Sequence, residues 1–339
     1  MRLTSCIYQF FDQYLPHIKG CSPNTVKSYR DTLAMFLPFA DEYHSIKIDS
    51  LSPEHLSTDL VLAFLNWLES DRHNTSRTRN QRLAVLKSLA KMIRFMYPEK
   101  QKLAESILAI PQKRSQRKLI GFLYPQEIFN VLQNVNIIKK DGFRDYTLLH
   151  LLYDSGARAA EIATLRLDYF DYSNETLAIL GKGNRYRQIE LLSKTAALIH
   201  QYIAKYRRSP NAFCKDNLFV NQRGAAFTRH GINRLCKKYL NRTLSAKRLN
   251  LIHPAHSFRH SCAVRMIAEG KPVSDIKNRL GHENVQSTMV YLQMDLGQKR
   301  VLQEKFIRFT QQHLMSDPKI DELIQWENKQ DILEWLDSL

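Results

Sequence analysis

The chain has 339 residues, and its 50 lysines and arginines against 33 aspartates and glutamates give a formal charge of +17. With 44% hydrophobic and 24% charged residues, the composition excludes a chain disordered throughout, and no apolar run approaches the roughly 18 residues of a membrane helix. The polar N-terminus is not typical of a signal peptide, and five cysteines without paired spacing favour a reducing compartment. We therefore expect a soluble, cytoplasmic, two-domain protein, and a polyanion such as nucleic acid as its partner.

Residues 1–110 are predicted to form an all-helical domain. Ser22-Pro23 and Ser52-Pro53 are typical helix starts, because serine accepts a backbone N–H bond and proline needs none at the first helical position. A third helix is expected over about 75–96, and its inward positions recur at helical spacing: Leu83, Leu86, Ala90 and Ile93. Its other faces carry a basic stripe that we expect to face DNA phosphates, namely Arg77, Arg79 and Arg82.

A boundary follows the helical domain. Residues 111–121 are basic, begin with a proline and contain few apolar residues, so they are predicted to be a linker. Three of its side chains are expected to lie along a DNA backbone: Lys113, Arg114 and Arg117.

Residues 122–310 are predicted to form a second domain of mixed α+β structure, which makes the protein mainly α with a small β-hairpin or sheet. Apolar residues alternate over Thr176–Leu191 around a turn at Gly181–Asn184, a pattern typical of a hairpin. Farther on, Thr228 is a helix cap, and the segment 227–238 is predicted to be a helix that enters the major groove. Its polar side chains suited to DNA are Arg229, Asn233, Arg234 and Lys237.

Several common kinds of site are not supported. The nucleotide-binding patterns GxxxxGK[ST] and GxGxxG are absent. The cluster from His253 to Cys262 lacks the spacing of CxxC or HExxH, and Arg259 within it would repel a cation. We therefore predict no metal and no cofactor. His256 and Arg259, three apart on one helix face, can instead point at one phosphate.

Other parts of the chain contain further residues suited to an anion. Arg158 lies among glycine and alanine, where Glu161 can pair with it, and Lys182 stands between two glycines at the hairpin tip. His282 and Tyr291 are nine residues apart. Each residue alone also has an ordinary structural interpretation: a turn charge for Lys182, a helix cap for His282 and a core aromatic for Tyr291.

Together, the ordered set GARxxE, a lysine hairpin, HxxR, LGH and the later tyrosine resembles the tyrosine recombinase, or phage integrase, family over most of residues 1–310. Phe258, where the family commonly has leucine, is a mild departure. The resemblance implies a SAM-like core-binding domain, a catalytic domain and a 3′-phosphotyrosyl intermediate formed without metal or ATP. It implies an active site supported by Glu161 and consisting of Arg158, Lys182, His256, Arg259, His282 and the nucleophile Tyr291.

The resemblance also implies partners: double-stranded DNA with core recombination sites, and a homo-tetramer or paired recombinases on synapsed DNA. DNA integration, excision or transposition is the leading interpretation, and the compact N-terminus is expected to leave no room for an arm-binding domain. Dimer resolution by the same chemistry, a monomeric type IB topoisomerase and a DNA-binding regulator without catalysis are the alternatives.

The C-terminal segment differs in charge from the rest of the chain. Residues 311–339 contain seven acidic and two basic residues, a net charge of −5, which leaves +22 for the first 310 residues. Apolar residues recur there at helical spacing after Asp317-Pro318, so an acidic helical tail is expected. Docking on its own domain and docking on a neighbouring protomer both remain open.

Overall fold

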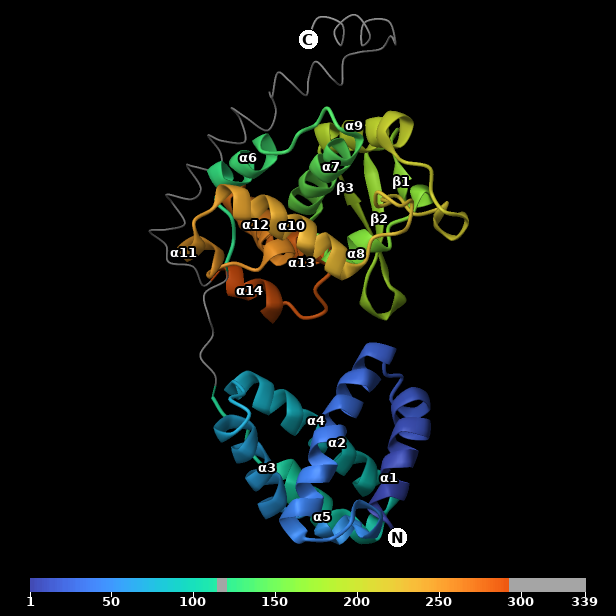
Figure 1. Ribbon diagram of the computed structural model, residues 1–339, viewed down its shortest axis with the longest axis vertical. Coiled ribbons are helices and arrows are strands. Elements are labelled where there is room, and N and C mark those ends of the chain that lie inside the picture. The colour runs from blue at the N-terminus through green and yellow to red at the C-terminus, as the bar shows by residue number, and fades with distance from the viewer. Residues whose placement is uncertain (115–120, 293–339) are drawn as a thin grey trace, which may run out of the picture. The chain divides into compact units, whose positions relative to one another are not determined.

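The computed structural model describes residues 1–114 and 121–292, without the side chains of Lys182 and Leu292. It divides into two units, Met1–Lys118 and Leu119–Leu339 (Figure 1). The division falls within the segment 111–121 that the sequence predicts as a linker. Arg117 and the acidic tail at 311–339 lie outside the described residues.

The first unit is entirely helical over residues 1–114. Ser22 Oγ accepts from Thr25 N–H and Thr75 Oγ1 from Thr78 N–H, so the predicted helix starts at these two positions are confirmed. The inward positions predicted for the third helix are buried in the core of this unit. Its elements are α1 (Leu3–Gln9), a π-helical continuation (Phe10–Ile18), α2 (Pro23–His44), α3 (Thr58–Ser70), α4 (Ser76–Met96) and α5 (Gln101–Ala109), with short 3-10 turns at Ile48–Ser50, Pro53–His55 and Pro98–Lys100.

The helix start predicted at Ser52-Pro53 is wrong. Ser52 opens only a 3-10 turn, because His55 folds back and its Nδ1 accepts from the Ser52 backbone N–H at 2.9 Å. The chain then leaves the helical conformation, and α3 begins after a second cap, in which Ser57 Oγ accepts from Leu60 N–H. Two serine caps in close succession therefore mark one turn and one helix.

The second unit combines helices with a three-stranded antiparallel sheet in the order β1-β2-β3, so the predicted mainly α class with a small sheet is confirmed. In Figure 1 the strands lie at one side of this unit and α10 and α12 at the other. No helix within residues 1–114 and 121–292 is long and apolar enough to cross a membrane. The elements are α6 (Pro125–Gln133), α7 (Lys140–Ser155), α8 (Ala159–Ala163), β1 (Phe170–Asp171), β2 (Thr176–Leu180), β3 (Tyr186–Glu190), α9 (Ser193–Gln201), a π-helical continuation (Tyr202–Tyr206), α10 (Arg229–Thr243), α11 (Ala246–Leu249), α12 (Pro254–Ala268), α13 (Val273–Leu280) and α14 (Gln286–Leu292), with 3-10 turns at Leu167–Tyr169, Lys182–Asn184 and Ala212–Cys214.

The predicted hairpin is β2 and β3. Leu177 pairs with Ile189 and Ile179 with Arg187, and the three apolar residues are buried. At the tip, Gly183 and Asn184 have φ of 73° and 59°, a left-handed conformation that glycine and asparagine adopt most readily. The turn chemistry therefore places Lys182 at the exposed end of the hairpin.

Asp154, near the end of α7, fixes the helices that surround the site. Its buried carboxylate accepts from Arg265 of α12 at 3.3 Å, from Arg279 of α13 at 2.7 Å and from the Leu192 backbone N–H at 2.8 Å. Burial opposes ionisation, but the two arginines outweigh it and hold the pKa of Asp154 below its usual value. One buried charge thus holds α7, α12 and α13 together.

Candidate active site

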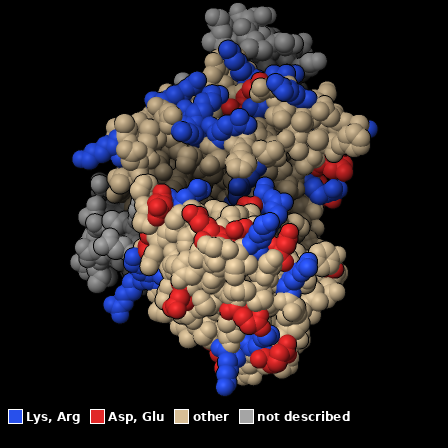
Figure 2. All heavy atoms as spheres, turned by 60° about the horizontal axis from the view of Figure 1, so that its bottom comes forward, with Lys and Arg blue, Asp and Glu red and all other residues tan. Residues whose placement is uncertain are grey.

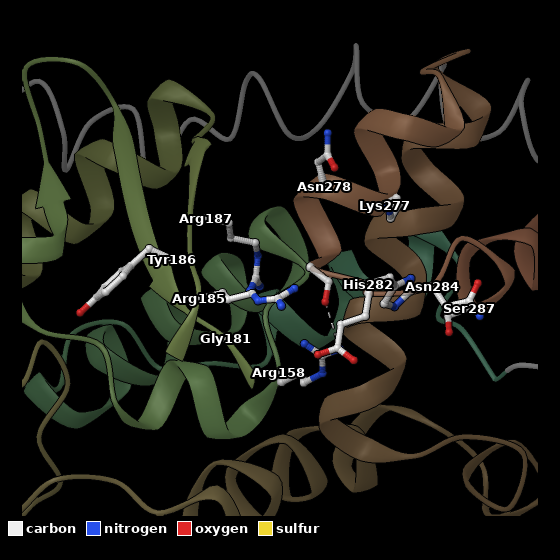
Figure 3. Close-up of a pocket in the computed structure, with 12 residues that line it drawn as sticks. Arg158, Gly181, Arg185, Tyr186, Arg187, Lys277, Asn278, His282, Asn284 and Ser287 are labelled. Carbon is white, nitrogen blue, oxygen red and sulfur yellow. Dashed lines mark hydrogen bonds between the residues drawn. The ribbon is translucent and has the colours of Figure 1, made fainter. Parts of the chain in front are cut away.

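A pocket of about 540 Å³ opens in the second unit, between the hairpin and the end of α13. Arg158, Arg187 and His282 lie around the same opening, whereas Tyr186 points away from it (Figure 3). The pocket contains more arginine than acid, so it suits an anion. Its lining is formed by Arg158, Gly181, Arg185, Tyr186, Arg187, Lys277, Asn278, Gly281, His282, Glu283, Asn284 and Ser287.

Arg158 and Glu161 form the pair that the sequence predicts, at the start of α8. Arg158 Nη1 donates to Glu161 Oε1 at 2.8 Å, and the Arg158 backbone N–H donates to Oε2 at 2.8 Å. Nη2 reaches the Gly281 carbonyl at 3.4 Å. The Arg158 side chain is 36% exposed, whereas that of Glu161 is buried, so the carboxylate holds the guanidinium while part of it stays open.

Arg259 enters the site from α12 and is almost fully buried, with 2% of its surface exposed. Its Nη1 donates to the Gly156 carbonyl at 2.7 Å, but Nη2 has no partner within the described residues. Burial, together with the charge of Arg158, lowers the pKa of Arg259 to about 10, so the group remains a cation at neutral pH. A buried guanidinium with a free N–H is costly unless a ligand accepts from it.

Two predicted histidines frame these arginines. His256 is exposed on α12, and partial desolvation together with Arg259 lowers its pKa. His282 Nδ1 lies 2.9 Å from Thr288 Oγ1, and desolvation with Arg259 lowers the pKa of His282 to about 4. His282 is therefore neutral at neutral pH, so its ring can donate one N–H bond without adding charge.

Tyr291 lies on α14 and is 3% exposed, packed in a small apolar cluster with Cys262, Ile276 and Leu280. Its hydroxyl lies 2.7 Å from His260 Nδ1. Burial raises the pKa of Tyr291 to about 12, with Arg259 acting in the opposite direction. It does not line the pocket described above, so its hydroxyl must become accessible before it can attack a phosphate there.

Two residues in this site were missed by sequence reasoning. Arg187 on β3 donates to both oxygens of Glu161, and its signal was an arginine at the inward position two residues before buried Ile189. His260 bonds Tyr291, and its signal was its position four residues after His256 on one helix face.

The predicted DNA-contact residues fall into different environments. Arg79 is buried and its Nε lies 3.5 Å from Glu69 Oε2, so the structure corrects the prediction for Arg79: it holds a carboxylate instead of facing a phosphate. Arg82 is half-buried and donates to Thr32 Oγ1 at 2.8 Å. Basic side chains are visible on both units in Figure 2. The exposed members of the predicted set are Arg77, Lys113, Arg114, Arg229, Asn233, Arg234 and Lys237.

The turn after α13 requires a glycine at position 281. Its φ is +65°, and an added Cβ would lie 2.8 Å from Arg187 Nη1. We expect Gly281→Ala to lose more than about 1 kcal/mol of unfolding free energy through the backbone alone, and to lose DNA cleavage because Arg187 is displaced. Gly270→Ala is the matched control, since Gly270 has φ +74° with nothing within 4 Å. Denaturant unfolding and a cleavage assay compare the two; equal cleavage by both variants would contradict the crowding at Gly281.

His150 of α7 gives the second unit an acid-sensitive core. Burial lowers its pKa to about 4, below the ordinary value of 6.5. Because the unfolded chain then binds more protons between these two values, stability falls as the pH drops from 6.5 to 4, by up to about 1.4 kcal/mol per pH unit. We expect His150→Gln to flatten this dependence in urea unfolding, and the same change at exposed His230 to leave it intact. An unchanged slope in His150→Gln would contradict the burial of a neutral imidazole.

The chain is similar to known proteins in both of its units. Residues 121–297 match the model of the phage integrase family, and residues 8–94 match the phage integrase N-terminal SAM-like domain. The chain is 30% identical over 304 residues to a Sinorhizobium fredii protein described as integrase/recombinase y4rC, covering 88% of this chain and 89% of that protein. It is 28% identical over 286 residues to tyrosine recombinase XerC of Anoxybacillus flavithermus, covering 83% of this chain and 90% of that protein.

Solved structures share the fold. The site-specific recombinase XerH bound to its difH substrate matches with a TM-score of 0.62 at 19% identity, covering 88% of this chain and 86% of that chain. The integrase of transposon Tn1549 in complex with a circular intermediate DNA matches with a TM-score of 0.64 at 17% identity, covering 88% and 98%.

Proposed function

The chain belongs to the phage integrase family and is a site-specific DNA recombinase that cleaves and rejoins DNA strands, and we propose which of its residues carry out the reaction. The proposed active site, supported by Glu161, is Arg158, Lys182, His256, Arg259, His282 and Tyr291. The observation that carries this proposal is that Arg158 and His282 line one pocket beside the lysine hairpin, with the buried guanidinium of Arg259 close enough to both to act on their charges.

The arginines neutralise the scissile phosphodiester. A phosphodiester anion repels nucleophiles, so cleavage requires donors aimed at its non-bridging oxygens. Arg158 offers a partly exposed guanidinium, and Arg259 offers the Nη2 group that has no partner within residues 1–114 and 121–292. His256 and His282 supply further N–H donors. The charge on the phosphate thus meets two fixed cations before attack.

Tyr291 is the proposed nucleophile, and His260 accepts its proton. Burial and His256 lower the pKa of His260 to about 3, so its ring is neutral at neutral pH and has a lone pair for the phenol proton. The anionic phosphate, once bound, raises that pKa again and makes the ring a stronger base. The two groups are already within hydrogen-bond distance, at 2.7 Å. Because Tyr291 is buried, DNA binding must shift α14 on α12 before its oxygen reaches the phosphorus.

Attack forms a bond from Tyr291 Oη to phosphorus and breaks the bond from phosphorus to the 5′ oxygen. The phenol proton passes to His260, and Lys182 at the hairpin tip protonates the departing 5′ oxygen. The 3′-phosphotyrosyl link retains the phosphodiester energy, so a 5′-hydroxyl of another strand can reverse the step. We propose that this exchange needs neither a metal nor ATP.

The proposed setting is double-stranded DNA with core recombination sites in the cytoplasm, acted on by a homo-tetramer or by paired recombinases. Integration, excision or transposition of a mobile element is the leading role, supported by the likeness to the Tn1549 integrase fold and the y4rC relative. Dimer resolution uses the same chemistry and is supported by the XerC relative. A monomeric topoisomerase is not favoured, since the relatives are recombinases.

Covalent trapping tests the proposed reaction. The full chain is incubated with sheared DNA from its source and denatured with detergent, and the DNA that remains attached is sequenced. We expect a denaturant-resistant complex that carries one recurring short sequence. Binding without such a complex would indicate a regulator, and relaxation of supercoils by monomers at unrelated sequences would indicate a topoisomerase.

A further inference from the structure

Arg187 connects three parts of the site that lie far apart in the sequence: the β2–β3 hairpin, the Arg158–Glu161 pair and the Gly281 turn. It lies on β3, three residues after Asn184 at the hairpin tip, and only 12% of its side chain is exposed. Its Nη2 and Nη1 donate to Glu161 Oε2 at 2.7 Å and Oε1 at 3.2 Å. Its Nε donates to the Arg279 carbonyl, just before the Gly281 turn, at 2.9 Å. All three of its nitrogens are therefore used.

Glu161 is shared between two arginines. Its two oxygens accept from Arg158 at 2.8 Å, through Nη1 and the backbone N–H, and also from Arg187. Burial opposes ionisation of Glu161, but the bonds from Arg187 and Arg158 outweigh it and hold its pKa below the usual value. The carboxylate is thus charged at neutral pH, and it couples the position of Arg158 to that of β3.

The hairpin tip is connected to Glu161 through β3. The Gly181 backbone N–H donates to the Arg185 carbonyl at 2.8 Å, which closes the base of the turn that contains Lys182. Arg187 is two residues beyond that closing bond. The end of β3 therefore cannot move away from Glu161 without breaking the two hydrogen bonds from Arg187 to the carboxylate. Arg187→Lys keeps the charge, but its single nitrogen cannot replace the three guanidinium nitrogens that bond Glu161 and the Arg279 carbonyl.

We propose that Arg187 is a positioning residue that holds the Lys182 hairpin in register with the Arg158–Glu161 pair and the Gly281 turn. This inference rests on the proposed function, in which Lys182 protonates the leaving 5′ oxygen. Loss of the hydrogen bonds of Arg187 lets the hairpin move relative to the phosphate. A displacement of about 1 Å lowers the rate of cleavage on the order of 10²-fold.

A change of leaving group tests this role. The probe is a nicked duplex with the sequence recovered by covalent trapping, made with oxygen or with sulfur as the 5′ bridging atom of the scissile phosphate. A thiol has a pKa near 8.5, so a sulfur leaving group departs without an acid. We expect Arg187→Lys to cleave the oxygen substrate about 10- to 100-fold more slowly than the native protein and the sulfur substrate at a nearly native rate.

Three controls accompany the test. Lys182→Ala is expected to show the same rescue by sulfur. Arg158→Ala is expected to show none, because the guanidinium that neutralises the phosphate is then missing. Arg166→Lys changes a surface arginine that pairs with Asp168, and it is expected to cleave both substrates normally. If Arg187→Lys does not fold, as judged by its thermal unfolding, Arg187→Gln takes its place.

The outcomes are distinct. Slow cleavage of both substrates by the Arg187 variant, or normal cleavage of both, overturns the positioning role. A native protein that forms no adduct with either substrate overturns the proposed function instead. Absence of sulfur rescue in Lys182→Ala removes the acid role of Lys182 and, with it, the inference about Arg187.

Discussion

Tyr291→Phe is expected to form no covalent DNA adduct while it binds DNA like the native protein. The phenylalanine ring retains the packing against Cys262 and Leu280, so the local structure persists. Only the hydroxyl oxygen is lost, and with it the bond to His260 and the atom that attacks phosphorus. A denaturing gel measures the adduct, and a mobility shift on the same DNA measures binding.

Tyr186→Phe is the matched control for this experiment. Tyr186 lines the same pocket, is 59% exposed, and its hydroxyl lies 2.9 Å from that of Tyr169. Tyr186 is thus a tyrosine that lines the pocket without any shift of α14, although its ring points away from the opening (Figure 3). We expect Tyr186→Phe to retain the adduct; an adduct that survives Tyr291→Phe and disappears in Tyr186→Phe would assign the nucleophile to Tyr186.

Arg259→Gln is expected to cleave DNA at least 10²–10³-fold more slowly without a loss of stability above about 1 kcal/mol. The free Nη2 of Arg259 has no partner to lose within the described residues, and its buried charge is costly to the fold. Apart from the Nη1 bond to the Gly156 carbonyl, the contribution of Arg259 is thus made to the reaction and not to folding. Cleavage rates under single turnover and urea unfolding of the same variant measure the two effects.

Arg265→Gln gives the opposite pattern on the same helix. Arg265 is also buried, but it pairs with Asp154 at 3.3 Å. Breaking a buried pair of this kind costs about 3–5 kcal/mol, so we expect this variant to lose stability first. If Arg259→Gln is destabilised as strongly as Arg265→Gln, Arg259 is a structural residue, and its assignment to the phosphate is wrong.

Local signals in the sequence predicted much of the fold. The helix start at Ser22-Pro23, the helix over about 75–96 with its inward face, and the β2–β3 hairpin depend on nearby residues, and all are confirmed. The pair of Arg158 with Glu161 was also predictable, because the two residues are one helical turn apart.

Tertiary contacts limited what the sequence could predict. Arg79 belongs to the basic stripe by pattern, but Glu69 of the preceding helix draws it into the core. Arg187 and His260 matter because of partners 26 and 31 residues away, and no local period reveals such partners. The side chain of Lys182 and the acidic tail lie outside the described residues, so their roles remain predictions.

The most direct test of this mechanism is the identity of the amino acid that holds the trapped DNA. The covalent complex is digested with nuclease and protease, and the modified peptide is sequenced by mass spectrometry. We predict a nucleotide joined through its 3′ phosphate to Tyr291, with a free 5′-hydroxyl on the released strand. A nucleotide on any other residue, or one joined through its 5′ phosphate, would contradict it.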